Sequence, residues 1–70
     1  MADMDELDPI RALVVEAMAE LEQALVAGLP AQAPASGKRE IALSLAALRE
    51  RIENAVRKIE KAESLLSAVR

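Results

Sequence analysis

The residues best placed to bind a ligand are the four at positions 36–39, Ser36-Gly37-Lys38-Arg39. They precede a helical segment, and the start of a helix presents free backbone N–H groups and the positive end of the helix dipole. With two cations beside them, these N–H groups suit an anion such as phosphate. The segment is not a P-loop, because no strand is expected before it and its glycines lack the spacing of that motif. An ordinary capped helix start with charged flanks is the alternative, and the sequence leaves both interpretations open.

A second basic group lies further along the chain and alternates with glutamates. Its members are Arg49, Arg51, Arg57, Lys58 and Lys61, among Glu50, Glu53, Glu60 and Glu63. This alternation is typical of a solvated helix surface laced with salt bridges. Duplex binding requires a net basic domain and single-strand binding uses aromatic platforms, whereas this chain has a net charge of −3 and no aromatic residue. DNA and RNA polymers are therefore not expected as partners, while a small anion held by arginines of several chains stays open.

The composition argues against catalysis and metal binding. The chain has no histidine and no cysteine. Its serines therefore lack the usual general base, histidine, and the chain lacks the cysteine thiolates and histidine imidazoles that most often bind zinc. Paired carboxylates would need a cleft of low dielectric to separate their pKa values, and two helices alone do not form one. We predict no catalytic residue, no metal site and no cofactor, so the chain is not expected to be an enzyme.

Two helices must position these groups within a single all-α domain over residues 1–70. Asp8-Pro9 predicts a helix start, because aspartate caps free N–H groups and proline suits the first helical position. Gly28 and Pro30 predict its end. We therefore expect a frayed, non-helical acidic lead over 1–7, a short helix over 8–27, a linker over 28–37 and a long helix over 38–70. The linker exceeds what a tight helical hairpin needs, so the first helix could pack on its own chain or on a neighbour.

The long helix carries an unbroken apolar seam. Its positions are Ile41, Leu45, Leu48, Ile52, Ala55, Ile59, Ala62, Leu66 and Val69, at alternating steps of four and three. This heptad spacing predicts a left-handed coiled coil, and the two alanines favour close approach of the helices. A first helix of roughly 28 Å would cover little more than half of a second helix of roughly 50 Å. We therefore expect the hairpins to assemble into a homo-oligomeric bundle, whose number of copies the seam does not fix.

The expected compartment is the cytoplasm. A chain without cysteine fits reducing conditions. No apolar run of 18 residues is present to span a membrane, and the acidic start is the reverse of a signal peptide.

The order of the segments resembles that of the phage anti-CBASS cyclic-nucleotide sponges. In that family an acidic first helix, a loop and a longer second helix follow one another. The matching pieces over residues 7–59 are Leu7-Asp8-Pro9, Arg39, Ile41-Ala42, Leu48, Ile52 and Val56-Arg57. The family's helix usually carries a threonine and aromatic residues, whereas this chain has Ala46 near the expected threonine and no aromatics. Base stacking would therefore be lost.

The resemblance implies a non-enzymatic homo-oligomer, in the host cytoplasm if phage-encoded, that sequesters cyclic di- or trinucleotides between protomers. It implies that Lys38, Arg39 and Arg57 neutralise the phosphates. Two other hypotheses rest on the helices alone. In one, the chain is a small interaction module (an inhibitor, chaperone or adaptor) that binds a host protein through its seam. In the other, it is a structural bundle that sets the valency of an assembly.

Overall fold

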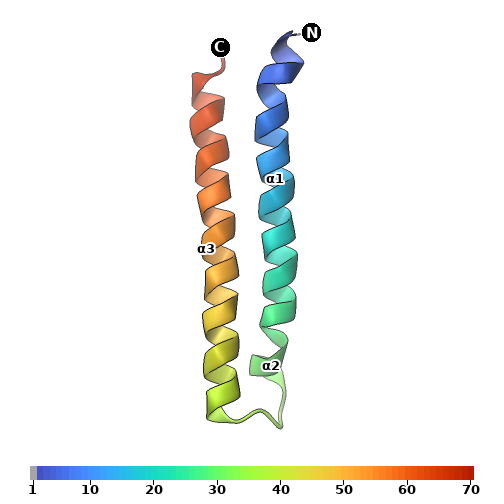
Figure 1. Ribbon diagram of the computed structural model, residues 1–70, viewed down its shortest axis with the longest axis vertical. Helices are drawn as coiled ribbons and strands as arrows, with labels where there is room; N and C mark the ends of the chain where they lie inside the picture. Colours follow the sequence, from blue (N-terminus) through green and yellow to red (C-terminus); the bar gives the residue numbers. More distant parts are fainter. Residues whose placement is uncertain (1) are drawn as a thin grey trace.

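The chain forms a helical hairpin. The computed structural model describes residues 2–70, with side chains from Glu6 onward. Helix α1 spans Ala2–Ala27, the one-turn helix α2 spans Leu29–Gln32, and helix α3 spans Lys38–Ala68. Helices α1 and α3 run antiparallel, with both chain ends at one end of the rod and α2 at the other (Figure 1). The all-α hairpin is thus confirmed, and the first helix packs on the second helix of its own chain.

Helix α1 begins six residues earlier than predicted and continues through Pro9. The expectation of an acidic lead was therefore wrong for residues 2–7, and Met1 lies outside the described residues. Extending an existing helix costs much less than starting a new one, and half-buried Leu7 and Ile10 give the added turns an apolar contact. Pro9 lies in the third turn of α1, where it removes one backbone hydrogen bond and its ring crowds the carbonyl four residues earlier. Because α1 runs along most of α3, helix length alone no longer argues for a second chain.

The segment between the long helices is more ordered than a linker. Gly28 has helical φ and ψ angles of −82° and −10°, and it leads directly into α2. Pro30 lies in the first turn of α2, where proline is tolerated because the first N–H groups have no helical partner. At the start of α3, Gly37 rather than a serine occupies the capping position, and its N–H donates to a Glu40 carboxylate oxygen at 3.5 Å.

Small residues line the contact between α1 and α3. The buried positions are Ala17, Ala24 and Gly28 on the first arm, and Ser44, Ala55 and Ala62 on the second. Several of them are seven residues apart, so they fall on one stripe of each helix. Small side chains let two helices approach closely, and Ala55 is only 1% exposed. Among the side chains that the structure describes, no large one is fully buried.

Candidate functional site

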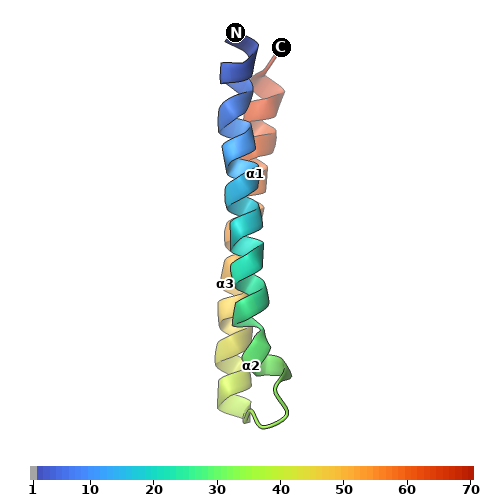
Figure 2. The same cartoon turned by 90° about the vertical axis from the view of Figure 1, so that its right-hand side faces the viewer.

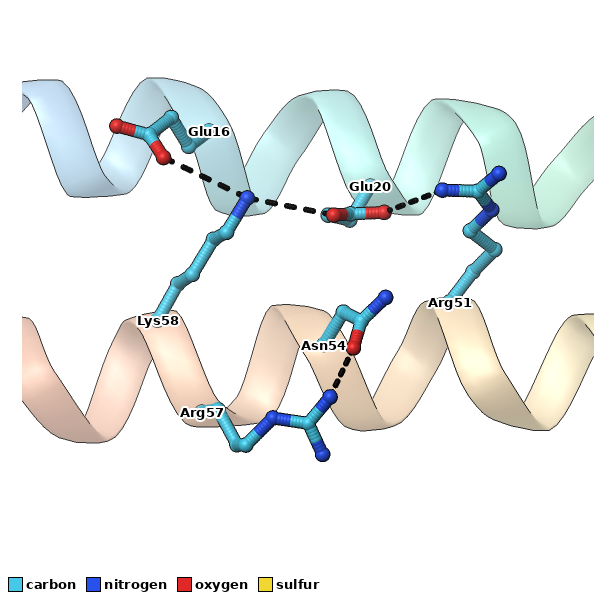
Figure 3. A network of polar contacts seen from close by, with 6 residues as sticks. All are labelled: Glu16, Glu20, Arg51, Asn54, Arg57 and Lys58. Carbon is cyan, nitrogen blue, oxygen red and sulfur yellow. Dashed lines mark hydrogen bonds and ion pairs between the residues drawn. The ribbon is translucent and has the colours of Figure 1, made fainter.

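One side of the hairpin carries a network of ion pairs between the two helices. The Glu20 carboxylate accepts hydrogen bonds from Arg51 Nη1 at 3.1 Å and from Lys58 Nζ at 3.3 Å. Lys58 also lies 3.5 Å from a Glu16 carboxylate oxygen (Figure 3). The Arg51 hydrogen bond, followed by that of Lys58, holds the pKa of Glu20 below its usual value. These contacts fix which residues of α1 and α3 lie level with each other.

A second polar contact ties the turn to α3. The buried Ser44 hydroxyl donates to the Ala27 carbonyl oxygen at 2.5 Å and accepts from the Ala31 N–H at 3.2 Å. Both backbone groups sit where α1 ends and α2 takes over, so neither is fully satisfied by its own helix. A single hydroxyl therefore provides a hydrogen-bond partner for both backbone groups and holds the turn against α3.

The opposite side of the hairpin is apolar. On α1, Glu20 flanks the buried alanine stripe on one side and Leu21 flanks it on the other. On α3, Arg51 and Ile52 flank Ala55 in the same manner. Since Glu20 and Arg51 pair on one side of the hairpin, the flanks that hold Leu21 and Ile52 must share the other side.

We call this side the apolar face. It is defined by Val14, Met18, Leu21 and Leu25 of α1 and by Leu45, Ile52, Val56 and Ile59 of α3, at the i, i+3, i+4 and i+7 spacing of a helix stripe. All eight residues are exposed, from 41% for Leu21 to 73% for Leu25. A shallow groove runs along the α3 half of the face, between Leu45, Leu48 and Ile52, with Arg49 and Glu53 at its rim. Large exposed apolar patches are uncommon on monomeric proteins.

The structure divides the predicted seam of α3 into two sets. Ile41, Leu48, Ala55, Ala62 and Val69, each seven residues from the next, are buried or half-buried, and Leu48, Ala55 and Ala62 lie on the stripe that faces α1. Leu45, Ile52, Ile59 and Leu66 are exposed and form the α3 row of the apolar face and its continuation. One set of seam residues is therefore buried or half-buried within the hairpin, and the other set lies on the exposed apolar face.

The three predicted phosphate-binding residues do not lie together in one chain. Lys38 and Arg39 are exposed at the start of α3. Arg57 is roughly 27 Å further along the same helix, where its guanidinium donates to Asn54 and points away from α1 (Figure 3). Any site that combined the three residues would need several chains, so binding of cyclic nucleotides stays a prediction.

Sequence reasoning missed the structural roles of Glu20 and Ser44. Glu20 lies seven residues from Leu13 and from Ala27, so a charged residue within an otherwise apolar or small row was the available signal for it, whereas Ser44 shares its row with Arg51 and Lys58 and gave no such signal. Among the described residues, no group of three or more acidic side chains is arranged to hold a metal ion. No helix within residues 2–70 has the length and apolar character of a membrane span. Comparisons with protein-family models, curated proteins and solved structures found no match for this chain.

Proposed function

We propose that this chain is a non-enzymatic helical binding protein that associates with another protein through its apolar face. One observation carries the proposal: the fully buried residues of the contact between the helices are small, while most of the large apolar side chains, including all eight of the apolar face, are exposed. Burying a Leu, Ile or Met side chain contributes about 1.5–3 kcal/mol, several times what an alanine methyl group offers. The residues with most to gain from burial thus lie where only a second molecule can cover them.

The polar groups of the hairpin support a binding role over a catalytic one. Glu20, Arg51 and Lys58 are engaged with one another across the hairpin, and the Ser44 hydroxyl bonds backbone groups of the turn. The chain has no histidine or cysteine to activate a nucleophile. Recognition through an apolar helical surface needs none of these groups, because packing supplies the affinity.

Site-specific photo-crosslinking in cells of the source organism tests this function. A photoreactive side chain would replace Val56, which lies on the apolar face and is 46% exposed. The matched control places the same group at Arg57, the next residue, which a rotation of about 100° directs to the outer surface of α3. We expect protein adducts at position 56 and few at position 57. Equal yields at the two positions, or no adduct at position 56, would contradict the proposal.

A further inference from the structure

We propose that the occupant of the apolar face is a second copy of this chain, packed face to face with both turns at the same end. This inference rests on the proposed function, since it names the partner of the same face. In this arrangement a two-fold axis runs parallel to the helices, so α1 of each copy lies against α3 of the other. Two hairpins thus form a four-helix bundle in which neighbouring helices are antiparallel.

The exposed area of the single chain supports this partner. A compact globular protein of 7.5 kDa exposes about 4,200 Å², whereas this chain exposes 5554 Å². The surplus is roughly 1,300 Å² per chain. A stable interface of standard size buries about 800 Å² per partner, so one face-to-face contact can account for most of the surplus.

The shape of the hairpin also supports a second copy as the partner. The Cα atoms extend 54 × 16 × 10 Å, which is one layer of helices seen edge-on in Figure 2. Stable domains enclose a core between two layers. The radius of gyration is 16.3 Å, against about 11 Å for a globular chain of this length. A second copy of the chain would provide the second layer.

Apolar residues of α1 and α3 lie at the same heights along the rod, so those of one copy can contact those of the other. Glu16 pairs with Lys58, so Met18, two residues later on α1, lies level with Val56, two residues earlier on α3. By the same count Leu29 lies level with Leu45. When α1 of one copy lies beside α3 of the other and the turns share one end, these side chains meet in pairs across the interface.

Charge complementarity supports this orientation of the second copy. Glu63 lies in the α3 row that continues from Leu45, Arg49 and Val56 toward the C-terminus. It lies five residues after Lys58 and is therefore level with Arg11, five residues before Glu16. Turns at the same end place Arg11 of one copy beside Glu63 of the other, twice per dimer. The reverse orientation brings α3 against α3 and places Arg11 and Glu63 of different copies at opposite ends of the rod, so this pairing is lost.

The first test measures the mass of the purified chain by sedimentation equilibrium. We expect twice the 7.5 kDa of one chain. Val56→Glu on the apolar face should weaken the dimer at least a hundredfold, and Arg57→Glu, its neighbour on the outer surface, should leave the dissociation constant within about threefold. If the chain is a folded monomer at 100 μM, the proposal that a second copy occupies the apolar face is wrong. If adducts at position 56 still form in cells, the apolar face binds another protein and the proposed function stands; if they do not, both proposals fail.

A charge exchange tests the contact without placing a charge in the apolar face. Arg11→Glu or Glu63→Arg alone replaces two ion pairs by two repulsive contacts and should weaken the dimer roughly tenfold. Combining the two substitutions should restore the dissociation constant to within about threefold of the original. Purely additive weakening in the double variant would contradict the pairing of Arg11 with Glu63.

The orientation itself is measurable because the chain has no cysteine of its own. A single Ala35→Cys in the turn, carrying a nitroxide label, gives one spin per copy. With both turns at one end, we expect a label-to-label distance of roughly 30 Å or less, since neighbouring helix axes lie about 10 Å apart. A distance near the 54 Å length of the rod would show the reverse orientation and overturn this arrangement.

Discussion

Replacing Ser44 by alanine tests whether one hydroxyl holds the turn against α3. In Ser44→Ala, the Ala27 carbonyl and the Ala31 N–H lose partners at 2.5 Å and 3.2 Å. An intramolecular hydrogen bond contributes about 0.5–1.5 kcal/mol, and both backbone groups are half-buried, so water replaces the hydroxyl only in part. The loss is therefore about 2 kcal/mol. Alanine is the better helix former by up to about 0.5 kcal/mol, which leaves a net destabilisation of about 1.5 kcal/mol.

The assay is thermal unfolding followed by circular dichroism at 222 nm, at one fixed protein concentration. For a chain of this size, about 1.5 kcal/mol lowers Tm by roughly 6–12 °C. Hydrogen exchange adds a local readout, because the Ala31 amide should lose protection while amides in the middle of α3 keep theirs.

The matched control is Ser67→Ala, the same chemical change on the same helix. The Ser67 hydroxyl donates to the Glu63 carbonyl oxygen within the last turns of α3 and is exposed. We expect its effect to stay within about 0.5 kcal/mol. If Ser44→Ala melts at the temperature of Ser67→Ala, the two hydrogen bonds contribute nothing and the reasoning about the turn is wrong.

Three further substitutions test other parts of the hairpin. Because the pKa of Glu20 is lowered in the folded state, its contribution to stability is present above the usual value of 4.5 and is lost as the pH falls through the folded value. The Tm values of wild type and Glu20→Gln should therefore differ at neutral pH and converge in acid. A difference in Tm that stays constant with pH would contradict this. Gly28→Ala should stabilise the chain by about 0.4–1 kcal/mol in denaturant unfolding, because Gly28 has helical angles and an added Cβ would make ordinary contacts of 3.5 Å or more; destabilisation would show that the site is too tight. Ala55→Leu should cost about 1–3 kcal/mol in the same assay by forcing the helices apart, whereas Ala46→Leu, on the exposed side of α3, should change stability by less than about 0.5 kcal/mol; equal effects would mean that the helices do not pack tightly at Ala55.

The fold could be predicted from the sequence because its periodic segments are long. The apolar spacing of α3 and the break after Ala27 were sufficient to predict two helices joined by a turn. The start of α1 was not predictable from local rules, since Asp8-Pro9 is a good helix start on its own. Its extension past Asp8 is accompanied by the partial burial of Leu7, and that burial is a tertiary effect.

The candidate site was harder to predict than the fold. A heptad pattern gives the positions that are apolar, but it does not say how many neighbouring helices those positions contact. Ala55 and Ile52 fit the same seam, yet Ala55 is 1% exposed against α1 and Ile52 is 42% exposed. Only the pairing of Glu20 with Arg51 and Lys58 on the other side shows which flank of the seam stays open.

Residue size along the seam of α3 predicts that folding of the hairpin and its proposed association are separate steps. Ala55 and Ala62 face α1 together with half-buried Leu48, and there close approach and the Glu20 ion pairs set the register but bury little apolar area. Leucine, isoleucine and valine face outward, where their burial depends on a partner and therefore on protein concentration. The hairpin alone should be only marginally stable, because a chain this short without cysteine for disulfides has few other sources of stability. Association through the apolar face would then supply much of the stability of the fold itself, and Tm should rise with protein concentration. A Tm that is independent of concentration over a hundredfold range would mean that the alanine contact is sufficient, and that the apolar face has a role other than stabilising the hairpin.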